Sequence, residues 1–572
     1  MPTHNRDIAA KFDELADLLE IQGANVFRVR AYRNGARTLR DLPHSVVQLL
    51  RDGTDLTELP GIGADLAQKT REIVETGELS DLQEIVQDVP ESLIDVMGIA
   101  GLGPKRVKTL YEALGVRDLA GLKKATESGE IQDLSGFGKK TEQNILEELA
   151  TRGSGEKRFR RRDAEELAEP LIEMLRQIDG VDQAIIAGSY RRRKETVGDL
   201  DILLSCSDAG PVMDRFVAYD DVQRVLSHGQ TRASVVLKGG LQVDLRAVAR
   251  ESYGAALHYF TGSQAHNIRV RQLGQQRGLK VNEYGVFEGE TRVAGRREVE
   301  VFEAVGLPEI VPELREDRGE IEAAQTDKLP DLVTLDDICG NLHSHTDWSD
   351  GAGTLEEMAQ AAKARGLSYL AITDHSKAVR VAGGLDADRL ARQIDAIDDL
   401  NESLDGITLL KGIEVDILED GTLDLPDAVL ARLDLTVCSI HSRMNLSGDK
   451  QTTRVLKAME NPNFTILGHP TGRLLGERAG YQLDMEQVIA QASQGGHVLE
   501  INAQPARLDL DDTHAKMARE AGVKLSIATD AHAGTHLDLM RFGVDQARRG
   551  WVTADDVINT RDLQGLRKLL RG

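Results

Sequence analysis

Short apolar runs recur at intervals through the last part of the chain, and helical segments separate them. The intervening segments, such as LEEMAQAAKARG and HAKMAREAG, carry apolar residues at helical spacing. The apolar runs are YLAIT, TLLKGI, LDLTVCSI, FTILG, GHVLEI and VKLSIAT. This alternation predicts a barrel-like sheet of strands wrapped in helices, which would occupy residues 335–572.

Histidine and acidic residues stand at the C-terminal ends of these runs. In a β/α barrel the side chains at that end of the strands meet in one place. A single residue of this kind is more often a satisfied core histidine or a solvated acid, but nine at corresponding strand ends predict a metal site. The nine candidate ligands are His343, His345, Asp350, His375, Glu414, His441, His469, Asp530 and His532.

The number and type of these candidate ligands indicate which ions they would bind. His343 and His345 are two residues apart, so on a strand both imidazoles would face one side and could share a metal. Mixed nitrogen and oxygen ligands suit Zn²⁺ or Mn²⁺ better than Mg²⁺ alone. Nine ligands exceed what two ions need, so a cluster of three is expected. Asn502, at another strand end, is a weaker candidate for contacting a metal ligand or the substrate, and Arg473, in GHPTGR, is a weaker candidate for meeting a phosphate.

A pair of carboxylates marks a second candidate metal site in the segment DQAIIAGSYRRRKETVGDLDILLS (182–205). Asp199 and Asp201 are two apart on a predicted strand, so both face one side, where they repel unless a cation neutralises them. Asp244, on the predicted strand LQVDLRAV, supplies a third acid. Such oxygen ligands suit Mg²⁺ or Mn²⁺. An isolated Asp-x-Asp pair is a common exposed strand pattern, but the basic Gly-Ser loop before this one favours a phosphate-bearing ligand.

Three Gly-x-Gly turns, each followed by an amphipathic helix, lie in LPGIGADLAQKTREIVETG (59–77), IAGLGPKRVKTLYEALG (99–115) and LSGFGKKTEQNILEEL (134–149). One copy would indicate only a helix–helix turn. Three copies, two of them followed by basic residues, predict helix N-termini that grip phosphates without regard to base sequence. The candidate DNA-binding residues are Gly61, Gly63, Gly101, Gly103, Lys105, Gly136, Gly138 and Lys139.

Length and charge limit the remaining possibilities. A chain of 572 residues exceeds what one core usually serves, so three or more domains are expected. The net charge of −24 argues against a nucleic-acid partner, but most of the acidic excess lies in the last third. Basic runs occur at 157–162 and 191–194. No apolar run approaches the roughly 20 residues that span a bilayer. Three scattered cysteines fit a reducing cytoplasm, and we expect a cytoplasmic monomer without a membrane partner.

These motifs resemble two known families. GSYRRRKETVGDLDILL is similar to the palm motif of family X DNA polymerases, and YFTGSQAHNIRVRQLGQQRGLKVNEYGVF (259–287) is similar to their thumb. LPGIGADLAQKTREIVETG resembles their small N-terminal domain. HSHTDWSDG, TDHS, GIEVDI, SIHS, GHPTGR and TDAH resemble the PHP domain, a metal-dependent phosphoesterase named for polymerases and histidinol phosphatases.

The resemblance implies a multidomain chain: a helical helix-hairpin-helix region, an α+β nucleotidyltransferase palm and thumb, and a distorted β/α barrel. The implied parts are a small DNA-binding domain (1–85), fingers (86–156), a palm (157–250), a thumb (251–315), a linker (316–334) and a PHP domain (335–572). The linker segment is charged and lacks a sustained apolar stripe.

The resemblance also implies roles for individual residues. Asp199 and Asp201 would bind two Mg²⁺ or Mn²⁺ ions, and Asp244 would bind the ion that activates the primer 3′-hydroxyl. Residues matched to the triphosphate are Gly188, Ser189 and Arg192, with Gly198 nearby; those beside the sugar are Tyr259, Phe260 and Gly262; those at the nascent base pair and template are Asn267 and Arg271.

Three positions qualify this match. Arg193 stands where many relatives carry glycine, and Gln242 stands where some carry a basic residue. Lys69 aligns with a lysine that some relatives use as a Schiff-base nucleophile on abasic-site sugar. The neighbouring Asp65 is acidic where those relatives are basic, and it would raise the pKa of that lysine.

The expected function is short-gap DNA synthesis in base excision repair, on gapped or primed DNA with deoxynucleoside triphosphates. The PHP domain would add a 3′–5′ exonuclease, a 3′-end phosphoesterase or an abasic-site endonuclease. One alternative is a PHP domain whose metals serve only structure, which the complete ligand set disfavours. A phosphatase acting on a small molecule such as histidinol phosphate is another, which the DNA-gripping half disfavours.

Overall fold

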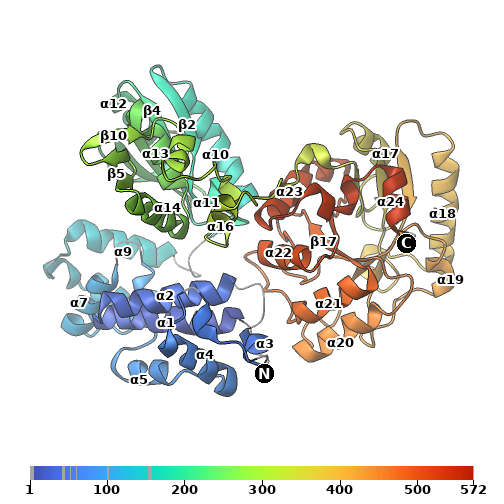
Figure 1. The fold of residues 1–572 in the computed structure, drawn as a ribbon, viewed down its shortest axis with the longest axis horizontal. Coiled ribbons are helices and arrows are strands. Elements are labelled where there is room, and N and C mark those ends of the chain that lie inside the picture. Colours follow the sequence, from blue (N-terminus) through green and yellow to red (C-terminus); the bar gives the residue numbers. More distant parts are fainter. Residues whose placement is uncertain are drawn as a thin grey trace. The chain divides into compact units, whose positions relative to one another are not determined.

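The structure, a computed structural model, describes residues 5–41, 46–51, 53–59, 61–99, 102–134, 136–151 and 158–570. The chain divides into two compact units, Met1–Lys157 and Arg158–Gly572 (Figure 1). Each unit is described by itself below.

The first unit is built from helices around one apolar core. Phe12, Tyr32 and Ile145 lie in this core and are at most 1% exposed. The helices α4, α7 and α9 each begin directly after the second glycine of a Gly-x-Gly turn, which confirms the predicted turn-then-helix pattern. The helices are α1 (Asn5–Gln22), α2 (Val26–Asp41), α3 (Val46–Arg51), α4 (Ala64–Thr76), α5 (Ser80–Asp88), α6 (Leu93–Met97), α7 (Pro104–Leu114), α8 (Leu119–Glu127) and α9 (Lys139–Thr151).

The palm opens the second unit with a five-stranded sheet in the order β2-β4-β7-β6-β5. Apolar residues of α10 and α12, among them Leu171 and Phe216, pack on this sheet. β4 and β7 run parallel, and the other neighbours in the sheet are antiparallel. The elements are β1 (Phe159–Arg160), α10 (Arg161–Arg176), β2 (Val181–Ile186), α11 (Gly188–Arg191), β3 (Thr196–Val197), β4 (Asp199–Cys206), α12 (Gly210–Val217), β5 (Val222–His228), β6 (Arg232–Leu237) and β7 (Gln242–Val248). The strands predicted around the carboxylate pair are therefore confirmed.

The thumb follows as two helices, a three-stranded antiparallel sheet and a further helix. Its elements are α13 (Tyr253–Thr261), α14 (Gln264–Gln276), β8 (Leu279–Asn282), β9 (Gly285–Glu288), β10 (Thr291–Ala294) and α15 (Glu298–Ala304).

Residues 316–334, which the sequence analysis predicts as a linker, fold onto the thumb. This segment contains α16 (Glu320–Gln325), and Ile321, 1% exposed, joins the thumb core. Glu320 is fully buried and lies 2.8 Å from Nδ1 of His266. The segment has too few apolar residues to form a stripe. Its apolar residues Ile321 and Ala324 nevertheless pack in the thumb core, and its buried Glu320 is paired with His266.

The remaining residues form the barrel. Its parallel strands make a sheet in the order β11-β12-β13 and another in the order β14-β15-β16-β17-β18. Isolated bridges from His375 to Glu414 and from Ser344 to Ala531 connect the two sheets at both edges, so the ring closes as a distorted barrel. The strands are β11 (Gly340–Asn341), β12 (Tyr369–Ile372), β13 (Thr408–Lys411), β14 (Glu414–Asp416), β15 (Val437–Ser439), β16 (Ile466–Leu467), β17 (Val498–Asn502) and β18 (Leu525–Ala528).

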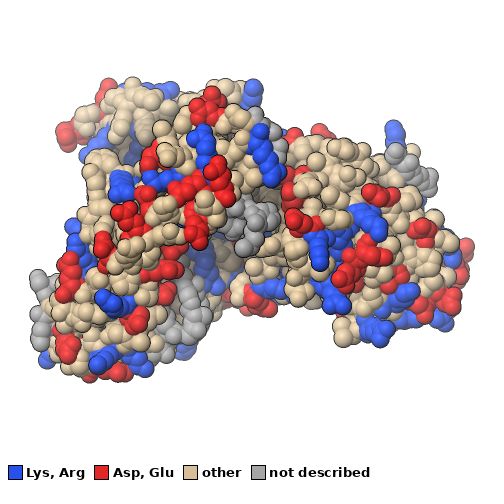
Figure 2. All heavy atoms as spheres, turned by 90° about the horizontal axis from the view of Figure 1, so that it is seen from below, with Lys and Arg blue, Asp and Glu red and all other residues tan. Residues whose placement is uncertain are grey.

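Helices alternate with these strands along the chain, as the sequence predicts. They are α17 (Leu355–Lys363), α18 (Ala387–Asn401), α19 (Asp427–Leu430), α20 (Gly448–Ala458), α21 (Met485–Gly495), α22 (Asp512–Glu520), α23 (Met540–Arg549) and α24 (Leu563–Leu570). Within the described ranges, no helix combines the length and the apolar character needed to cross a membrane. Lysine and arginine are interspersed with aspartate and glutamate over the face that Figure 2 presents.

Candidate active sites

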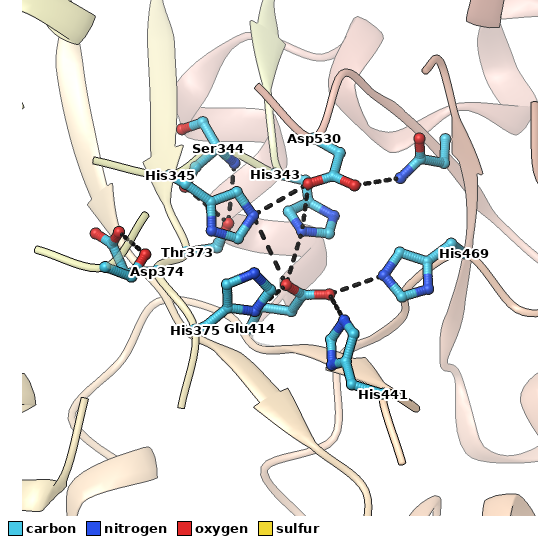
Figure 3. A network of polar contacts seen from close by, with 12 residues as sticks. His343, Ser344, His345, Thr373, Asp374, His375, Glu414, His441, His469 and Asp530 are labelled. Carbon is cyan, nitrogen blue, oxygen red and sulfur yellow. Dashed lines mark hydrogen bonds and ion pairs between the residues drawn. The ribbon is translucent and has the colours of Figure 1, made fainter. Parts of the chain in front are cut away.

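The nine candidate metal ligands of the barrel converge in one centre, and Figure 3 labels seven of them. Eight of the nine follow or begin a strand: His343 and His345 after β11, His375 after β12, Glu414 at the start of β14, His441 after β15, His469 after β16, and Asp530 and His532 after β18. Asp350 comes from the loop before α17. The parallel strands of a β/α barrel bring these positions together although up to 189 residues (532 − 343) separate them.

Glu414 lies among five of the histidines. Its Oε2 is 2.8 Å from Nδ1 of His375, and its Oε1 is 2.9 Å from Nε2 of His469 and 3.3 Å from Nε2 of His441. Nε2 of His343 is 3.5 Å from Glu414 Oε2. Nε2 of His345 is 3.6 Å from the same Oε2. The carboxylate is only 1% exposed and is surrounded by these imidazoles.

Two further acids complete the centre. Oδ1 of Asp530 lies 3.1 Å from Nε2 of His345 and 3.5 Å from Nε2 of His343. Asp350 is 36% exposed and lies 3.6 Å from Nε2 of His532. Three subsets each bring their ligand atoms within 4.8 Å of one another: His345, Asp350, His375 and His532; His343, His345 and Asp530; and His375, Glu414 and His441.

Several buried atoms of this centre fit divalent cations. Nε2 of His343, Nδ1 of His345 and Oε2 of Glu414 have no hydrogen-bond partner among the described residues. A buried polar atom without a partner costs about 1–3 kcal/mol, so such a group of converging atoms requires a ligand. Imidazole nitrogens with carboxylate oxygens are the donor set that Zn²⁺ and Mn²⁺ prefer.

Charge interactions set the protonation of the centre. Burial by itself would raise the pKa of Glu414, but His441, His375 and His343 hold it well below its ordinary value. Burial would lower the pKa of His441, yet Glu414 and Asp416 raise it to about 10. The carboxylates are therefore ionised, as metal ligands must be.

Two carboxylates that the sequence analysis missed orient the histidines. Oε1 of Glu500 lies 2.7 Å from Nδ1 of His343, and Oδ1 of Asp416 lies 3.1 Å from Nδ1 of His441. Such contacts fix which ring nitrogen faces a metal. The sequence carries a signal for Glu500, which is an acid between apolar residues of β17. Asp416 ends the short strand β14, two residues after Glu414.

The two weaker candidates have different surroundings. Nδ2 of Asn502 donates to Asp530 and to Glu500, at 3.2 Å each, so Asn502 holds two carboxylates of the centre in place. Arg473 pairs with Glu195, with 2.6 Å between Nη2 and Oε2. Its expected phosphate contact stays a prediction.

The palm brings its three aspartates together on β4 and β7. Asp201 and Asp244 are directly opposite each other in the parallel pairing, and Asp199 precedes Asp201 on the same side of the strand. Burial, Asp199 and Asp244 raise the pKa of Asp201 to about 6. Crowded carboxylate oxygens of this kind fit the Mg²⁺ or Mn²⁺ that the sequence predicts.

Asp244 has defined hydrogen-bond donors. Oγ of Ser234 donates to its Oδ1, and Nε2 of Gln242 donates to its Oδ2 at 3.2 Å. Nη2 of Arg232 is 4.0 Å from Oδ1. The glutamine that stands where some relatives carry a basic residue therefore contacts this carboxylate directly.

The basic loop after β2 begins beside these aspartates. Gly188 has a φ of +59°, and a Cβ at this position would come within 2.8 Å of Oδ2 of Asp201, so only glycine fits. Ser189 and Arg191 continue the short helix α11. Gly198 lies between β3 and β4, and a Cβ added to it would be 3.6 Å from Nη1 of Arg158.

Arg192 connects this loop to the thumb. Its Nη1 donates to the carbonyl of Thr261 at 2.5 Å, and a Cβ on Gly262 would lie 3.2 Å from the same nitrogen. Its Nε donates to Oε1 of Glu316 at 3.0 Å. The structure therefore brings the predicted triphosphate residue Arg192 against the predicted sugar-side residue Gly262.

The other thumb candidates lie on α13 and α14. Nδ2 of Asn267 donates to the carbonyl of Tyr259 at 2.7 Å, and Nε of Arg271 donates to the carbonyl of Asn267 at 3.3 Å. The ring of Phe260 lies under the guanidinium of Arg246, 4.6 Å from its centroid. These hydrogen bonds join Asn267 to Tyr259 and to Arg271.

The Gly-x-Gly turns of the first unit contain two kinds of glycine. Gly61 and Gly136 have φ values of +78° and +86°, which favour glycine. Gly63, Gly103 and Gly138 each precede a helix, and a Cβ on any of them would meet nothing within 4 Å. Gly101 lies outside the described residues. Lys105 and Lys139 are exposed beside these turns.

Lys69 does not have the depressed pKa of an amine nucleophile. Burial would lower the pKa of Lys69, but its hydrogen bond to Asp65 and the nearby Tyr32 and Asp81 raise it above the ordinary value. Nζ lies 3.4 Å from Oδ2 of Asp81. This is the direction that the acidic residue at position 65 predicts.

Five protein families match successive parts of the chain. The matching families are a helix-hairpin-helix domain (residues 3–79), a SAM-like helix-hairpin-helix tandem (93–151), the DNA polymerase beta palm (158–246), the DNA polymerase beta thumb (256–316) and the PHP domain (341–504).

Individual relatives match either the whole chain or its last part. A Bacillus subtilis (strain 168) protein described as DNA polymerase/3′-5′ exonuclease PolX is 40% identical over 572 residues, 99% of each chain. A probable phosphatase of Thermoanaerobacter sp. (strain X514) is 30% identical over 231 residues, which are 38% of this chain and 89% of the relative. Another, from Acetivibrio thermocellus, is 31% identical over 201 residues, 34% of this chain and 78% of the relative. The chain is similar over its full length to this polymerase, and its palm, thumb and PHP matches follow one another along the sequence. The chain therefore belongs to the family X DNA polymerases that carry a C-terminal PHP domain.

Proposed function

We propose that this chain fills short gaps in DNA during repair and trims the 3′ end of the same primer. The observation that carries the proposal is the presence, in one compact unit, of two separate groups of ligand-type residues with different chemistry. The palm group is made of carboxylates alone, and the barrel group combines imidazoles with carboxylates.

The palm residues would perform nucleotidyl transfer. Two Mg²⁺ or Mn²⁺ ions held by Asp199, Asp201 and Asp244 would supply the charge that activates the primer 3′-hydroxyl and stabilises the departing pyrophosphate. The loop of Ser189 and Arg192 binds the triphosphate, with the guanidinium as a charge-assisted donor. Gly188 lets the phosphates approach the aspartates because no Cβ stands between them.

The thumb residues would hold the rest of the nucleotide. Tyr259, Phe260 and Gly262 lie beside the sugar, and Asn267 and Arg271 contact the nascent base pair and the template. The hydrogen bond from Asn267 to the carbonyl of Tyr259 supports this, because it fixes the two groups relative to each other.

The barrel would hydrolyse the phosphodiester at the 3′ end. Three Zn²⁺ or Mn²⁺ ions held by the nine candidate ligands would activate water and polarise the phosphate. Glu414 and Asp530 neutralise the charge of those ions, and Glu500 and Asp416 orient His343 and His441. The similarity of the barrel to shorter relatives described as probable phosphatases favours a 3′-end phosphoesterase activity at the same centre.

The first unit would hold gapped or primed DNA through its helix N-termini. Both ligand groups come from one chain, which supports action as a monomer. The three cysteines are all unpaired, which supports a reducing compartment such as the cytoplasm.

The test uses a 5′-labelled primer in a single-nucleotide gap, with Mn²⁺, with and without deoxynucleoside triphosphates. The double variant Asp199→Ala/Asp201→Ala should lose primer extension and keep primer shortening. The double variant His343→Ala/His345→Ala should do the reverse. Wild-type shortening by the second variant would exclude the barrel as the nuclease and favour a structural role for its metals.

A further inference from the structure

The barrel contacts the basic loop of the palm at three positions, Arg192, Arg193 and Glu195. Nη1 of Arg549, on α23, donates to the carbonyl oxygen of Arg192 at 2.7 Å. Oδ1 of Asp545, on the same helix, lies 3.8 Å from Nε of Arg193. Arg473 pairs with Glu195 at 2.6 Å. The loop that we assign to the triphosphate is therefore held from the PHP domain.

Arg549 is the most enclosed of these contacts. Its side chain is 3% exposed, and it binds Asp512 through Nη2 at 2.5 Å and Glu316 through Nη1 at 3.1 Å. Burial would lower the pKa of Arg549, but Asp512 and Glu316 raise it, so the guanidinium stays charged. A charged, fully paired group at this depth is a rigid anchor for the carbonyl of Arg192.

Glu316 relays this anchor to the Arg192 side chain. Its Oε1 accepts from Nε of Arg192 at 3.0 Å and from Nη1 of Arg549 at 3.1 Å. Arg192 therefore has both its backbone and its guanidinium fixed, directly or through one carboxylate, by the same PHP residue. Nη2 of Arg192 makes no hydrogen bond to a described residue, so this nitrogen remains available to a phosphate oxygen.

The backbone of the loop needs such support. Arg193 has a φ of +58°, in the left-handed region that disfavours a residue with a Cβ. Strained backbone of this kind persists where the surroundings hold it. The Arg193 amide donates to the carbonyl of Tyr190 at 3.0 Å, and α23 adds Arg549 on the preceding carbonyl and Asp545 beside the side chain.

We propose that Arg549 of the PHP domain is a positioning residue for DNA synthesis, because it holds Arg192 in the geometry that binds the triphosphate. The PHP domain would thereby contribute to nucleotide affinity in the palm, apart from its own hydrolytic centre. This inference rests on the proposed assignment of Arg192 to the triphosphate.

The test compares steady-state gap filling and primer shortening by the full-length chain. Arg549→Ala should raise the KM for the deoxynucleoside triphosphate by about tenfold, the loss expected for a hydrogen bond to a charged donor. Its kcat for synthesis and its rate of primer shortening should stay within about twofold of wild type. Arg549→Lys should show a smaller rise, because an ammonium keeps the charge but cannot span all three acceptors.

Arg541→Ala is the matched control. Arg541 is also on α23 and also forms an ion pair with the palm, to Glu165 at 2.6 Å, but it does not contact the basic loop. It should leave the KM unchanged. An equal rise in both variants, or an unchanged KM in Arg549→Ala, would overturn the inference and leave Arg549 as interface packing only.

Two further measurements keep the outcomes separate. Arg192→Ala should raise the KM at least as much, and an unchanged KM there would refute the triphosphate assignment itself. If Arg549→Ala also loses primer shortening, the substitution has disrupted the barrel. The KM of Arg549→Lys for the deoxynucleoside triphosphate then tests the inference. A raised KM with full primer shortening supports positioning by Arg549, and an unchanged KM excludes it.

Discussion

The carboxylate of Glu500 lies 2.7 Å from Nδ1 of His343, whose other nitrogen, Nε2, is 3.5 Å from both Glu414 and Asp530. The two ring nitrogens thus face different partners: one a carboxylate that orients the ring, the other the candidate metal centre. Because Glu500 is fully buried in β17, its charge acts on His343 with little screening by solvent.

Glu500→Gln should weaken the barrel's metal affinity. The amide keeps the size of the carboxylate but loses the charge that makes His343 a stronger ligand, and loss of such a partner costs about 10–100-fold in metal affinity. Primer shortening should therefore require more Mn²⁺ and recover when Mn²⁺ is in excess. Gap filling by the same preparation is the internal control and should not change. An unaltered Mn²⁺ dependence would mean that Glu500 only fills space.

The glycines before α4, α7 and α9 should matter for DNA and not for folding. A Cβ on Gly63, Gly103 or Gly138 meets nothing within 4 Å, so the triple alanine variant should keep its melting temperature. The added methyl groups would stand where phosphates approach the helix N–H groups, and DNA affinity should fall severalfold.

Gly61→Ala is the contrasting variant. Its φ of +78° is unfavourable for alanine by about 1 kcal/mol, so its melting temperature should fall. Fluorescence anisotropy with labelled gapped DNA and thermal melting separate the two effects. Unchanged DNA affinity in the triple variant would remove these turns from the DNA-binding surface.

Lys69 should be a poor Schiff-base nucleophile at neutral pH. Its pKa is raised, chiefly by the hydrogen bond to Asp65 acting against burial, so little of the amine is neutral. Asp65→Asn should lower that pKa and increase borohydride trapping on abasic-site DNA at pH 7.5. Lys69→Ala gives the background. Strong trapping by the wild type that does not depend on Asp65 would contradict the electrostatic argument.

Regular spacing made much of this fold predictable from sequence. The alternation of apolar runs and helical segments predicted the barrel, and position at strand ends predicted that nine residues such as His343 and Asp530 would meet. The pair Asp199 and Asp201 predicted its strand because a two-residue period puts both on one side. In each case a local repeat carries the information.

Features without a local repeat were missed. Glu500 and Asp416 orient histidines that are 157 and 25 residues away, and the sequence around a strand acid does not show which side chain it faces. The segment around α16 lacks an apolar stripe, and its burial depends on the thumb and on the pairing of Glu320 with His266. Such partners are known only once the tertiary fold brings them together.

Asp201 should make the metal-free protein less stable at neutral pH. Burial and the charges of Asp199 and Asp244 raise its pKa from 3.8 to about 6, a difference that corresponds to about 3 kcal/mol. A carboxyl whose pKa is higher in the folded state binds its proton more tightly there. The resulting destabilisation is absent below about pH 4, grows as pH rises toward 6, and is complete above pH 6.

Asp201→Asn should therefore raise the melting temperature in the presence of a chelator at pH 7.5, although it removes a residue needed for synthesis. The gain should shrink as the pH is lowered from 7.5 to 5, because the wild-type carboxyl then takes up its proton. Added Mg²⁺ should stabilise the wild type more than the variant, since the cation neutralises the same carboxylates. A gain that is equal at pH 5 and pH 7.5 would show that repulsion among the three aspartates is not its source.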